Sequence, residues 1–192
     1  MKKIAMLLVA MVATLTSFAQ VAPGKFTIEP MVGFNVTDVT GDYYTSKVGV
    51  VAGVDFGYQF TKRFGLSVGA LYSLQGAQFS KTYNYEGVTF KVDGSNNNLS
   101  YINVPVLANV YVWRGLAVKA GVQPGFMVGA TGSTDPYNTV DLSIPVGVSY
   151  DFGFGLTVDG RYNIGVTNIV KYADPSVRNS VFQITAGYKF KL

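Results

Sequence analysis

The sequence predicts an all-β fold, an eight-stranded antiparallel up-and-down transmembrane β-barrel, on three observations. Eight segments alternate between apolar and polar residues with a period of two, as strands with two different faces do. No charged residue falls on the apolar face of any segment. The connections between the segments are alternately short and long, as in barrels of the bacterial outer membrane.

The eight segments span residues 26–36, 47–60, 64–78, 99–113, 116–130, 140–152, 155–168 and 180–190. Their apolar faces are continuous, whereas their other faces hold mainly Gly, Ser and Asn. A soluble β-sandwich would carry many Lys and Glu residues on its polar face, and small polar residues instead suit a narrow lumen. A Lys or Arg side chain that faced lipid at mid-bilayer would cost about 2–4 kcal/mol. The apolar face is therefore assigned to lipid.

The short connections lie at 61–63, 114–115 and near 151–153, and the long ones at 37–46, 79–98, 131–139 and 169–179. Short turns are periplasmic and long loops external in this class of barrel, so both termini are expected on the periplasmic side. The connection 79–98 itself alternates around Glu86 and Gly87. The third and fourth strands are therefore expected to continue as a hairpin above the membrane.

Aromatic residues gather near the expected membrane boundaries, where amphipathic rings are favoured. The expected periplasmic ring consists of Phe26, Tyr58, Phe60, Phe64, Trp113, Tyr150, Phe152, Tyr188 and Phe190, and the outer one of Phe34, Tyr72 and Phe126. Pro30, Pro105, Pro124 and Pro145 conflict with the pattern, because a closed barrel has no edge strand for a residue without an N–H donor. Bulges or strand ends are expected close to some of them.

The N-terminus has the features of a secretory signal peptide. A basic start, Met1–Lys3, precedes an apolar stretch, 4–13, and the small residues Ser17 and Ala19 follow. Cleavage is expected after Ala19, which leaves residues 20–192 as one β-barrel domain outside the cytoplasm. An uncleaved membrane anchor is the alternative, but the apolar stretch is short.

The composition argues against several classes of function. Cys and His are both absent, which removes thiolate chemistry and the commonest general base and metal ligand. The net charge of +4 is scattered rather than clustered, so no nucleic-acid partner is predicted. The acidic residues near loops, among them Asp141, lack the spacing of a calcium loop. No enzymatic activity, cofactor or metal is predicted.

The candidate site is a polar and charged network in the lumen. Its residues are Glu29, Asp55, Asn103, Lys119, Asp159, Arg161 and Lys189. Because an unpaired buried charge is costly, these groups are expected to pair and to fill the barrel; a narrow path for ions or water is the alternative. Tyr43, Tyr44, Tyr83 and Tyr85 in the long connections form an expected external recognition surface, or simply cap the barrel.

Three segments resemble the outer-membrane β-barrel family of Bacteroidetes, the porin family or PorT-like proteins. They are residues 101–107 (YINVPVL), 159–169 (DGRYNIGVTNI) and 181–190 (VFQITAGYKF), and the N-terminal sequence ending Ser17-Phe18-Ala19-Gln20 is typical of the same phylum. Asn103 departs from the family pattern, which often has Glu there. The resemblance implies the fold and an outer-membrane location. It implies function only loosely, because members include pores, adhesion proteins and secretion-system parts.

The sequence thus predicts a non-enzymatic protein of the outer membrane with a structural or surface-interaction role and a filled lumen. Its expected partners are outer-membrane lipid and surface or secretion-system proteins. Two alternatives remain: a small porin that conducts ions or small solutes, and a soluble secreted β-barrel that binds an apolar ligand. The second would need the apolar face to point inward.

Overall fold

The structure is a computed structural model of the chain, and it describes residues 21–39, 44–85, 88–130, 138–168 and 178–192. The side chains of residue 39 and of residues 44–45, 76–85 and 88–97 are not described. The described segments contain no helix that is long and apolar enough to cross a membrane.

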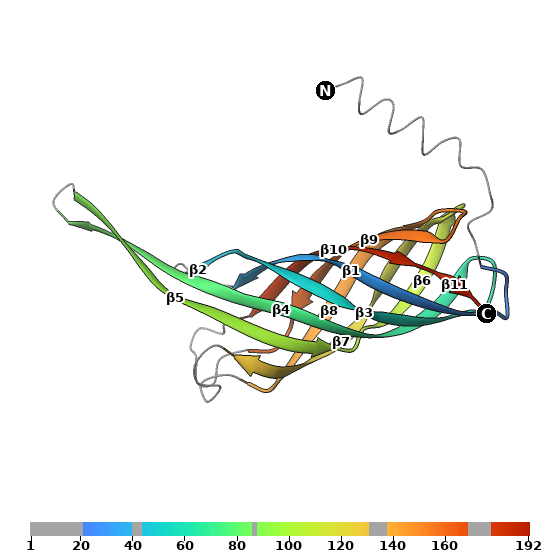
Figure 1. The fold of residues 1–192 in the computed structure, drawn as a ribbon, viewed down its shortest axis with the longest axis horizontal. Helices are drawn as coiled ribbons and strands as arrows, with labels where there is room; N and C mark the ends of the chain where they lie inside the picture. Colours follow the sequence, from blue (N-terminus) through green and yellow to red (C-terminus); the bar gives the residue numbers. More distant parts are fainter. Residues whose placement is uncertain (1–20, 40–43, 86–87, 131–137, 169–177) are drawn as a thin grey trace, which may run out of the picture.

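The described residues form one antiparallel sheet that closes into a barrel (Figure 1). Its strands are β1 (Phe26–Val39), β2 (Tyr44–Thr45), β3 (Lys47–Gln59), β4 (Phe64–Tyr85), β5 (Val88–Asn103), β6 (Val106–Trp113), β7 (Leu116–Ala130), β8 (Val140–Asp151), β9 (Leu156–Gly165), β10 (Asn179–Tyr188) and β11 (Phe190–Lys191). Each long strand pairs with its sequence neighbours, and β10 pairs with β1 to close the circle. Since β5 and β6 share one position in the barrel and β2 and β11 are two-residue extensions, the predicted eight-stranded up-and-down barrel is confirmed.

The register around the barrel is staggered. A row of paired residues that starts at Phe26 of β1 returns to the same strand at Val36, ten residues further along. The row passes through Tyr58, Leu66, Ala108, Ala120, Val146, Tyr162 and Phe182. This stagger tilts the strands, and an eight-stranded barrel of this kind has an interior about wide enough for its own side chains.

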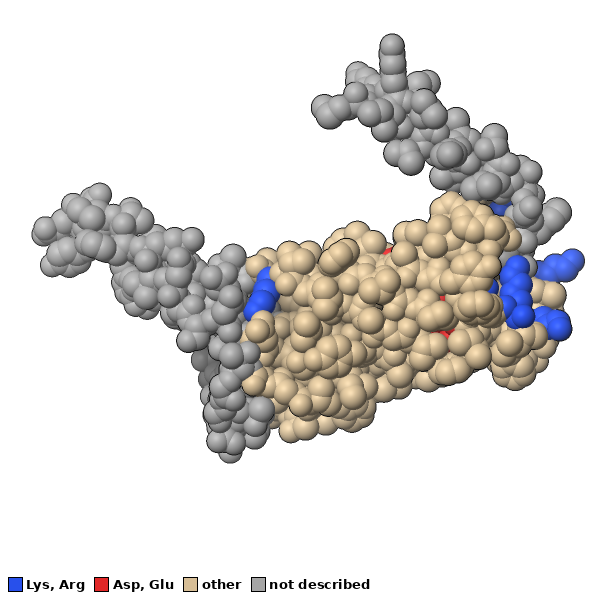
Figure 2. Space-filling model, viewed as in Figure 1, with Lys and Arg blue, Asp and Glu red and all other residues tan. Residues whose placement is uncertain are grey.

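The apolar faces point outward, as predicted. Phe34, Val106, Val146 and Ile184 are exposed, together with most large apolar side chains of the strands. Among the charged residues of the described strands, Asp38 falls on the outward face at the outer end, and Lys191 is exposed at the opposite end. In Figure 2 Lys and Arg likewise gather at the two ends of the visible surface. The alternative of a soluble barrel with an apolar interior is wrong, because the apolar belt surrounds the perimeter.

The predicted aromatic ring lies at the end with the short turns. Phe26 packs against Tyr58 at 4.7 Å between ring centroids, Tyr150 against Phe152 at 4.9 Å and Tyr188 against Phe190 at 4.8 Å. Phe154, which the prediction omitted, extends this ring next to Phe152. Lys25, Lys62, Arg63, Arg114 and Lys191 are exposed at the same end. Aromatic and basic side chains together therefore mark the periplasmic boundary.

The predicted fourth strand, 99–113, is wrong as one element. It ends at Asn103 and resumes at Val106, although the register with both neighbouring strands continues unchanged. Gly69 N–H still donates to the Pro105 carbonyl and Val104 N–H to the Pro124 carbonyl. The return bond of each pair is lost because proline has no N–H group.

The two other prolines also coincide with gaps. Pro30 lies where the partner of β1 changes from β10 to β11, and the β7–β8 ladder has a gap beside Pro145, between Ala120↔Val146 and Gln123↔Ser143. The predicted strand ends near prolines are confirmed.

The hairpin predicted from the alternation of residues 79–98 is also confirmed. β4 and β5 stay paired out to Tyr85↔Val88. They extend well beyond the other strands in Figure 1.

Candidate functional site in the barrel lumen

The structure brings all seven predicted lumen residues inside the barrel. Glu29, Asp55, Asn103, Lys119, Asp159 and Arg161 are buried, and only the end of Lys189 is partly accessible. The cause is local: side chains alternate across a strand, so every second residue faces inward. Six of the seven take part in two ion clusters, and Asn103 lies apart from both, in a polar layer nearer the outer end.

The central ion cluster is built around Asp159 on β9. Lys119 Nζ on β7 lies 2.8 Å from Asp159 Oδ2, and Arg161 Nε lies 2.5 Å from Asp159 Oδ1. Arg161 Nη2 also reaches Asp55 Oδ2 on β3 at 3.6 Å. Asp159 and Arg161 are each 1% exposed. Because the two residues are two positions apart, they share the inner face and can pair within one strand.

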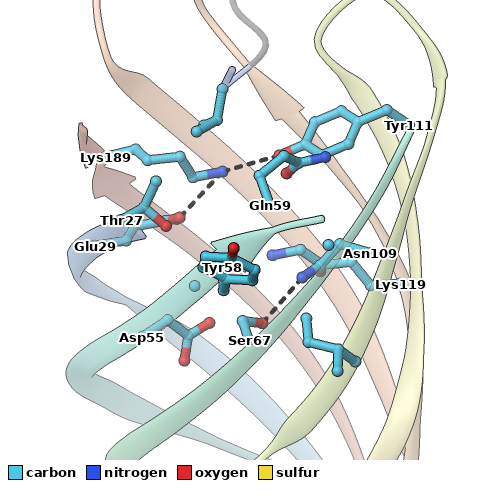
Figure 3. A pocket seen from close by; sticks show the side chains of 14 residues that line it. Thr27, Glu29, Asp55, Tyr58, Gln59, Ser67, Asn109, Tyr111, Lys119 and Lys189 are labelled. Carbon is cyan, nitrogen blue, oxygen red and sulfur yellow. Dashed lines mark hydrogen bonds and ion pairs between the residues drawn. The ribbon is translucent and has the colours of Figure 1, made fainter. Parts of the chain in front are cut away.

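The periplasmic ion cluster is built around Lys189 (Figure 3). Its Nζ atom lies 2.7 Å from Asp151 Oδ2 and 3.3 Å from Glu29 Oε2. The Tyr111 hydroxyl donates to Asp151 Oδ2 at 2.8 Å, and the Thr157 hydroxyl donates to Asp151 Oδ1 at 3.3 Å. Four strands, β1, β6, β8 and β9, and the residue between β10 and β11 are thereby joined inside the lumen.

Sequence reasoning missed Asp151 as a member of this network, because it interpreted the residue as part of a turn. The signal was present in the parity of β8. Asp151 continues the inward series of Asp141, Ser143 and Ser149. Buried Tyr111, which donates to Asp151, was not among the predicted site residues either.

An apolar layer and then a polar layer follow toward the outer end. Buried Met31, Val51 and Leu71 pack together on the inner face of the neighbouring strands β1, β3 and β4. Beyond them Asn35 donates to Ser73 at 2.7 Å, and Asn179 donates to Gln75 at 2.5 Å. Asn103, Gln123, Asn163 and Gln183 are buried in the same outer half. These amides, Asn103 excepted, were not among the predicted site residues.

The cavities that the described residues enclose in the lumen are small. The cavity between the two ion clusters has a volume of about 30 Å³ and is lined by Glu29, Asp55, Asn109, Lys119 and Lys189 among others (Figure 3). A second cavity in the outer polar layer has a volume of about 10 Å³. A single water needs roughly 10–15 Å³ measured in this way. The two cavities are therefore of a size for one or a few waters.

The chemistry that this lumen supports is electrostatic cross-linking. In the two clusters, each cation contacts a carboxylate of another strand. These ion pairs therefore link the strands to one another from inside the barrel. Within the described residues no group of three or more acidic residues is arranged to hold a metal ion.

The tyrosines proposed as a recognition surface cannot be placed as side chains. Tyr43 lies outside the described residues. Tyr44 belongs to β2, and Tyr83 and Tyr85 belong to the outer part of β4, but their side chains are outside the described part. They remain a prediction.

A closed antiparallel barrel with an apolar perimeter and an ionic interior defines an integral β-barrel protein of the outer membrane. The family model of the outer membrane protein beta-barrel domain matches residues 18–171. The chain belongs to this family, and its location is the outer membrane. No curated protein matches the chain.

Solved structures of outer-membrane barrels are similar in fold. Neisserial surface protein A is 14% identical, with a TM-score of 0.53 over 86% of this chain and 97% of that one. OprG from Pseudomonas aeruginosa is 14% identical, with a TM-score of 0.50 over 91% and 99%. Ail of Yersinia pestis, in complex with the heparin analogue sucrose octasulfate, is 14% identical, with a TM-score of 0.50 over 87% and 99%. At these identities the likeness concerns the fold alone.

Proposed function

We propose that this outer-membrane barrel is non-enzymatic, that its lumen is closed by its own side chains, and that it acts at the cell surface through its outer hairpin. The observation that carries the proposal is the layered filling of the lumen. Two ion clusters, an apolar layer and an amide layer succeed one another, and the cavities between them are about 30 and 10 Å³. A hydrated ion is larger than the space that these volumes offer.

The non-enzymatic part is supported by the partners of the buried ionic groups. Lys119, Arg161 and Lys189 are each held by carboxylates at 2.5–3.6 Å. A general base needs a group within reach of a bound substrate, and these groups face one another in a closed interior. The absence of His and Cys from the chain supports the same reading.

The surface role is supported by the β4–β5 hairpin. β5 pairs with β7 only from Leu99 onward, and β2 covers only Gln78 and Phe79 of β4. Among the described strands, the outer part of the hairpin therefore presents two free edges, to which an extended peptide can add as a further strand. Two barrels of similar fold point the same way, since one is named a surface protein and the other was solved with a heparin analogue. A surface or secretion-system protein is the proposed partner.

The resemblance to the Bacteroidetes porin or PorT-like family remains a proposal about the origin of the chain. The signal peptide belongs to the same proposal. Protein purified from outer membranes should begin at Gln20 when its N-terminus is sequenced. A mature protein that begins at Met1 would contradict cleavage after Ala19.

Conductance in planar bilayers tests the closed lumen. Protein that keeps a compact, faster-migrating form in SDS without heating is folded, and this form should give no regular conductance steps. Regular steps from the folded form would favour the small porin instead.

Surface display tests the hairpin. An epitope inserted between Tyr85 and Val88 should be detected by antibody on intact cells. Detection only after lysis would contradict the surface role.

A further inference from the structure

The buried charges of the described residues do not balance. Lys119, Arg161 and Lys189 face the lumen together with five carboxylates, and half-buried Lys47, paired with buried Thr37, falls on the same face of the wall at the outer end. The carboxylates are those of Glu29, Asp55, Asp141, Asp151 and Asp159. Because an uncompensated buried charge is strongly unfavourable, the excess carboxylates need either a bound proton or a bound cation as compensation.

Asp141 is the carboxylate that the two ion clusters do not include. It lies at the outer end of β8, and the three cations of the ion clusters lie nearer the periplasmic end. It accepts a hydrogen bond from the Thr167 hydroxyl at 2.6 Å and one from the amide of Asn179. No ion pair of Asp141 is present in the described part of the chain.

The small outer cavity lies beside Asp141 and is lined by amide side chains from five other strands. Three buried amide oxygens of its lining have no hydrogen-bond partner: Gln123 Oε1, Asn163 Oδ1 and Asn179 Oδ1. The residues that carry them are 3–4% exposed. One carboxylate, three unpartnered carbonyl oxygens and the unpartnered amide nitrogen of Asn103 therefore surround a space of about 10 Å³.

We propose that this cavity binds one hard cation, Ca²⁺ foremost, with Asp141, Gln123, Asn163 and Asn179 as its ligands. Ca²⁺ accepts carboxylate and amide oxygens in flexible geometry, whereas Mg²⁺ demands a near-ideal octahedron. A single carboxylate makes the site weak, with Kd on the order of 10⁻⁴–10⁻³ M, as in extracellular calcium modules. The inference goes beyond the proposed surface role and does not depend on it.

Binding of Tb³⁺, a luminescent substitute for Ca²⁺, tests the site in the full mature barrel purified in detergent and treated with a chelator. A Cβ atom at Gly125, which lines the cavity, would lie 3.5 Å from the ring of Tyr101, so this tyrosine is placed to sensitise the bound ion. The expected result is saturable luminescence that Ca²⁺ abolishes by competition. Millimolar CaCl₂ should also raise the thermal midpoint above that in choline chloride of equal ionic strength.

Two variants and one control decide the assignment. Asp141→Asn should weaken Tb³⁺ binding at least roughly tenfold, since the charge of the ligand set governs affinity. Asn163→Ala removes a ligand oxygen, keeps the charge and should weaken binding as well. Asp38→Asn, an equal charge change at an exposed residue of the same end, should bind like the wild type.

Cold SDS mobility verifies that each variant is folded, and a variant that fails to fold is replaced by the other. The proposal is overturned if the wild type shows no saturable luminescence, or if a folded Asp141→Asn or Asn163→Ala variant binds with wild-type affinity.

Discussion

At the scale of single residues, the fold depends on where the charges lie. Asp159 lies between Lys119 and Arg161 at 2.8 and 2.5 Å in a nearly solvent-free lumen. A buried pair gains little over a well-packed apolar alternative, but the loss of one partner leaves the other charge uncompensated. The carboxylate of Asp159 is the one shared by two cations, so its removal should have a larger effect than removal of either cation.

Asp159→Asn should therefore lower the free energy of unfolding by about 3–5 kcal/mol. Urea titration of the barrel in lipid vesicles, followed by the cold SDS mobility shift, measures this change. Asp38→Asn at the exposed outer end of β1 should change it by less than about 0.5 kcal/mol. Equal stability of the two variants would contradict the structural role of the cluster.

Parity along each strand made the lumen residues predictable, because a period of two assigns each side chain to one face. Glu29, Lys119 and Arg161 were assigned in this way. Pairing was not predictable in detail, since the contact of Lys189 with Asp151 depends on the register of strands far apart in the sequence. The predicted strand 140–152 already contained Asp151 at an inward position, but the residue was assigned to the turn near 151–153.

At the scale of strands, inward-facing glycines let neighbouring strands approach closely. A Cβ atom at Gly121 of β7 would lie 1.9 Å from the Val106 carbonyl oxygen of β6. A Cβ atom at Gly160 of β9 would meet nothing within 4 Å. Gly121 lies on the inward face and Gly160 on the outward face, so the two positions compare a crowded site of the wall with an open one.

Gly121→Ala should destabilise the barrel by about 1–3 kcal/mol, as overpacking does. Gly160→Ala should be neutral or stabilising by about 0.4–1 kcal/mol, because alanine restricts the unfolded chain. The same urea titration compares them. The packing described for β6 and β7 is wrong if both variants have wild-type stability.

On the lipid-facing surface, the cost of a charged substitution should depend on its depth in the membrane. Val146→Arg, at the middle of β8, should cost about 2–4 kcal/mol, and Val140→Arg, at its outer end, about 0–1 kcal/mol. Both side chains are exposed on the same strand and face. Folding yield and stability in vesicles measure the difference, and an equal cost at both positions would argue against a membrane around this strand.

The strands were predictable from alternation, and strand ends were expected near some of the prolines, but which proline would interrupt its strand was not predictable. Alternation continues through Val104 and Pro105 with the correct faces. The break at residues 104–105 arises because Pro105 and Pro124 lie in adjacent strands and each removes one ladder bond at the same level. The sequence alone does not reveal which residues face one another across strands.

At the scale of the whole molecule, the number of strands and the direction of the apolar face followed from the sequence. The cavities could not be predicted from the sequence. The size of a cavity depends on the ten-residue stagger of the strands together with the sizes of the inward side chains on all eight of them. The outer cavity is the clearest case. Its ligands come from four strands, and their spacing in the sequence resembles no metal motif.

The central claim is that apolar side chains surround the perimeter while the lumen is closed to lipid. Relaxation of side-chain methyl groups by nitroxide-labelled lipid chains, measured by NMR of the barrel in lipid nanodiscs, tests it most directly. The methyl groups of Val106, Val146 and Ile184 should be strongly relaxed, and those of buried Val51, Leu71 and Leu107 should be unaffected. Relaxation of the methyl groups of Val51, Leu71 and Leu107 without relaxation of those of Val106, Val146 and Ile184 would show that the apolar perimeter assigned here does not face lipid.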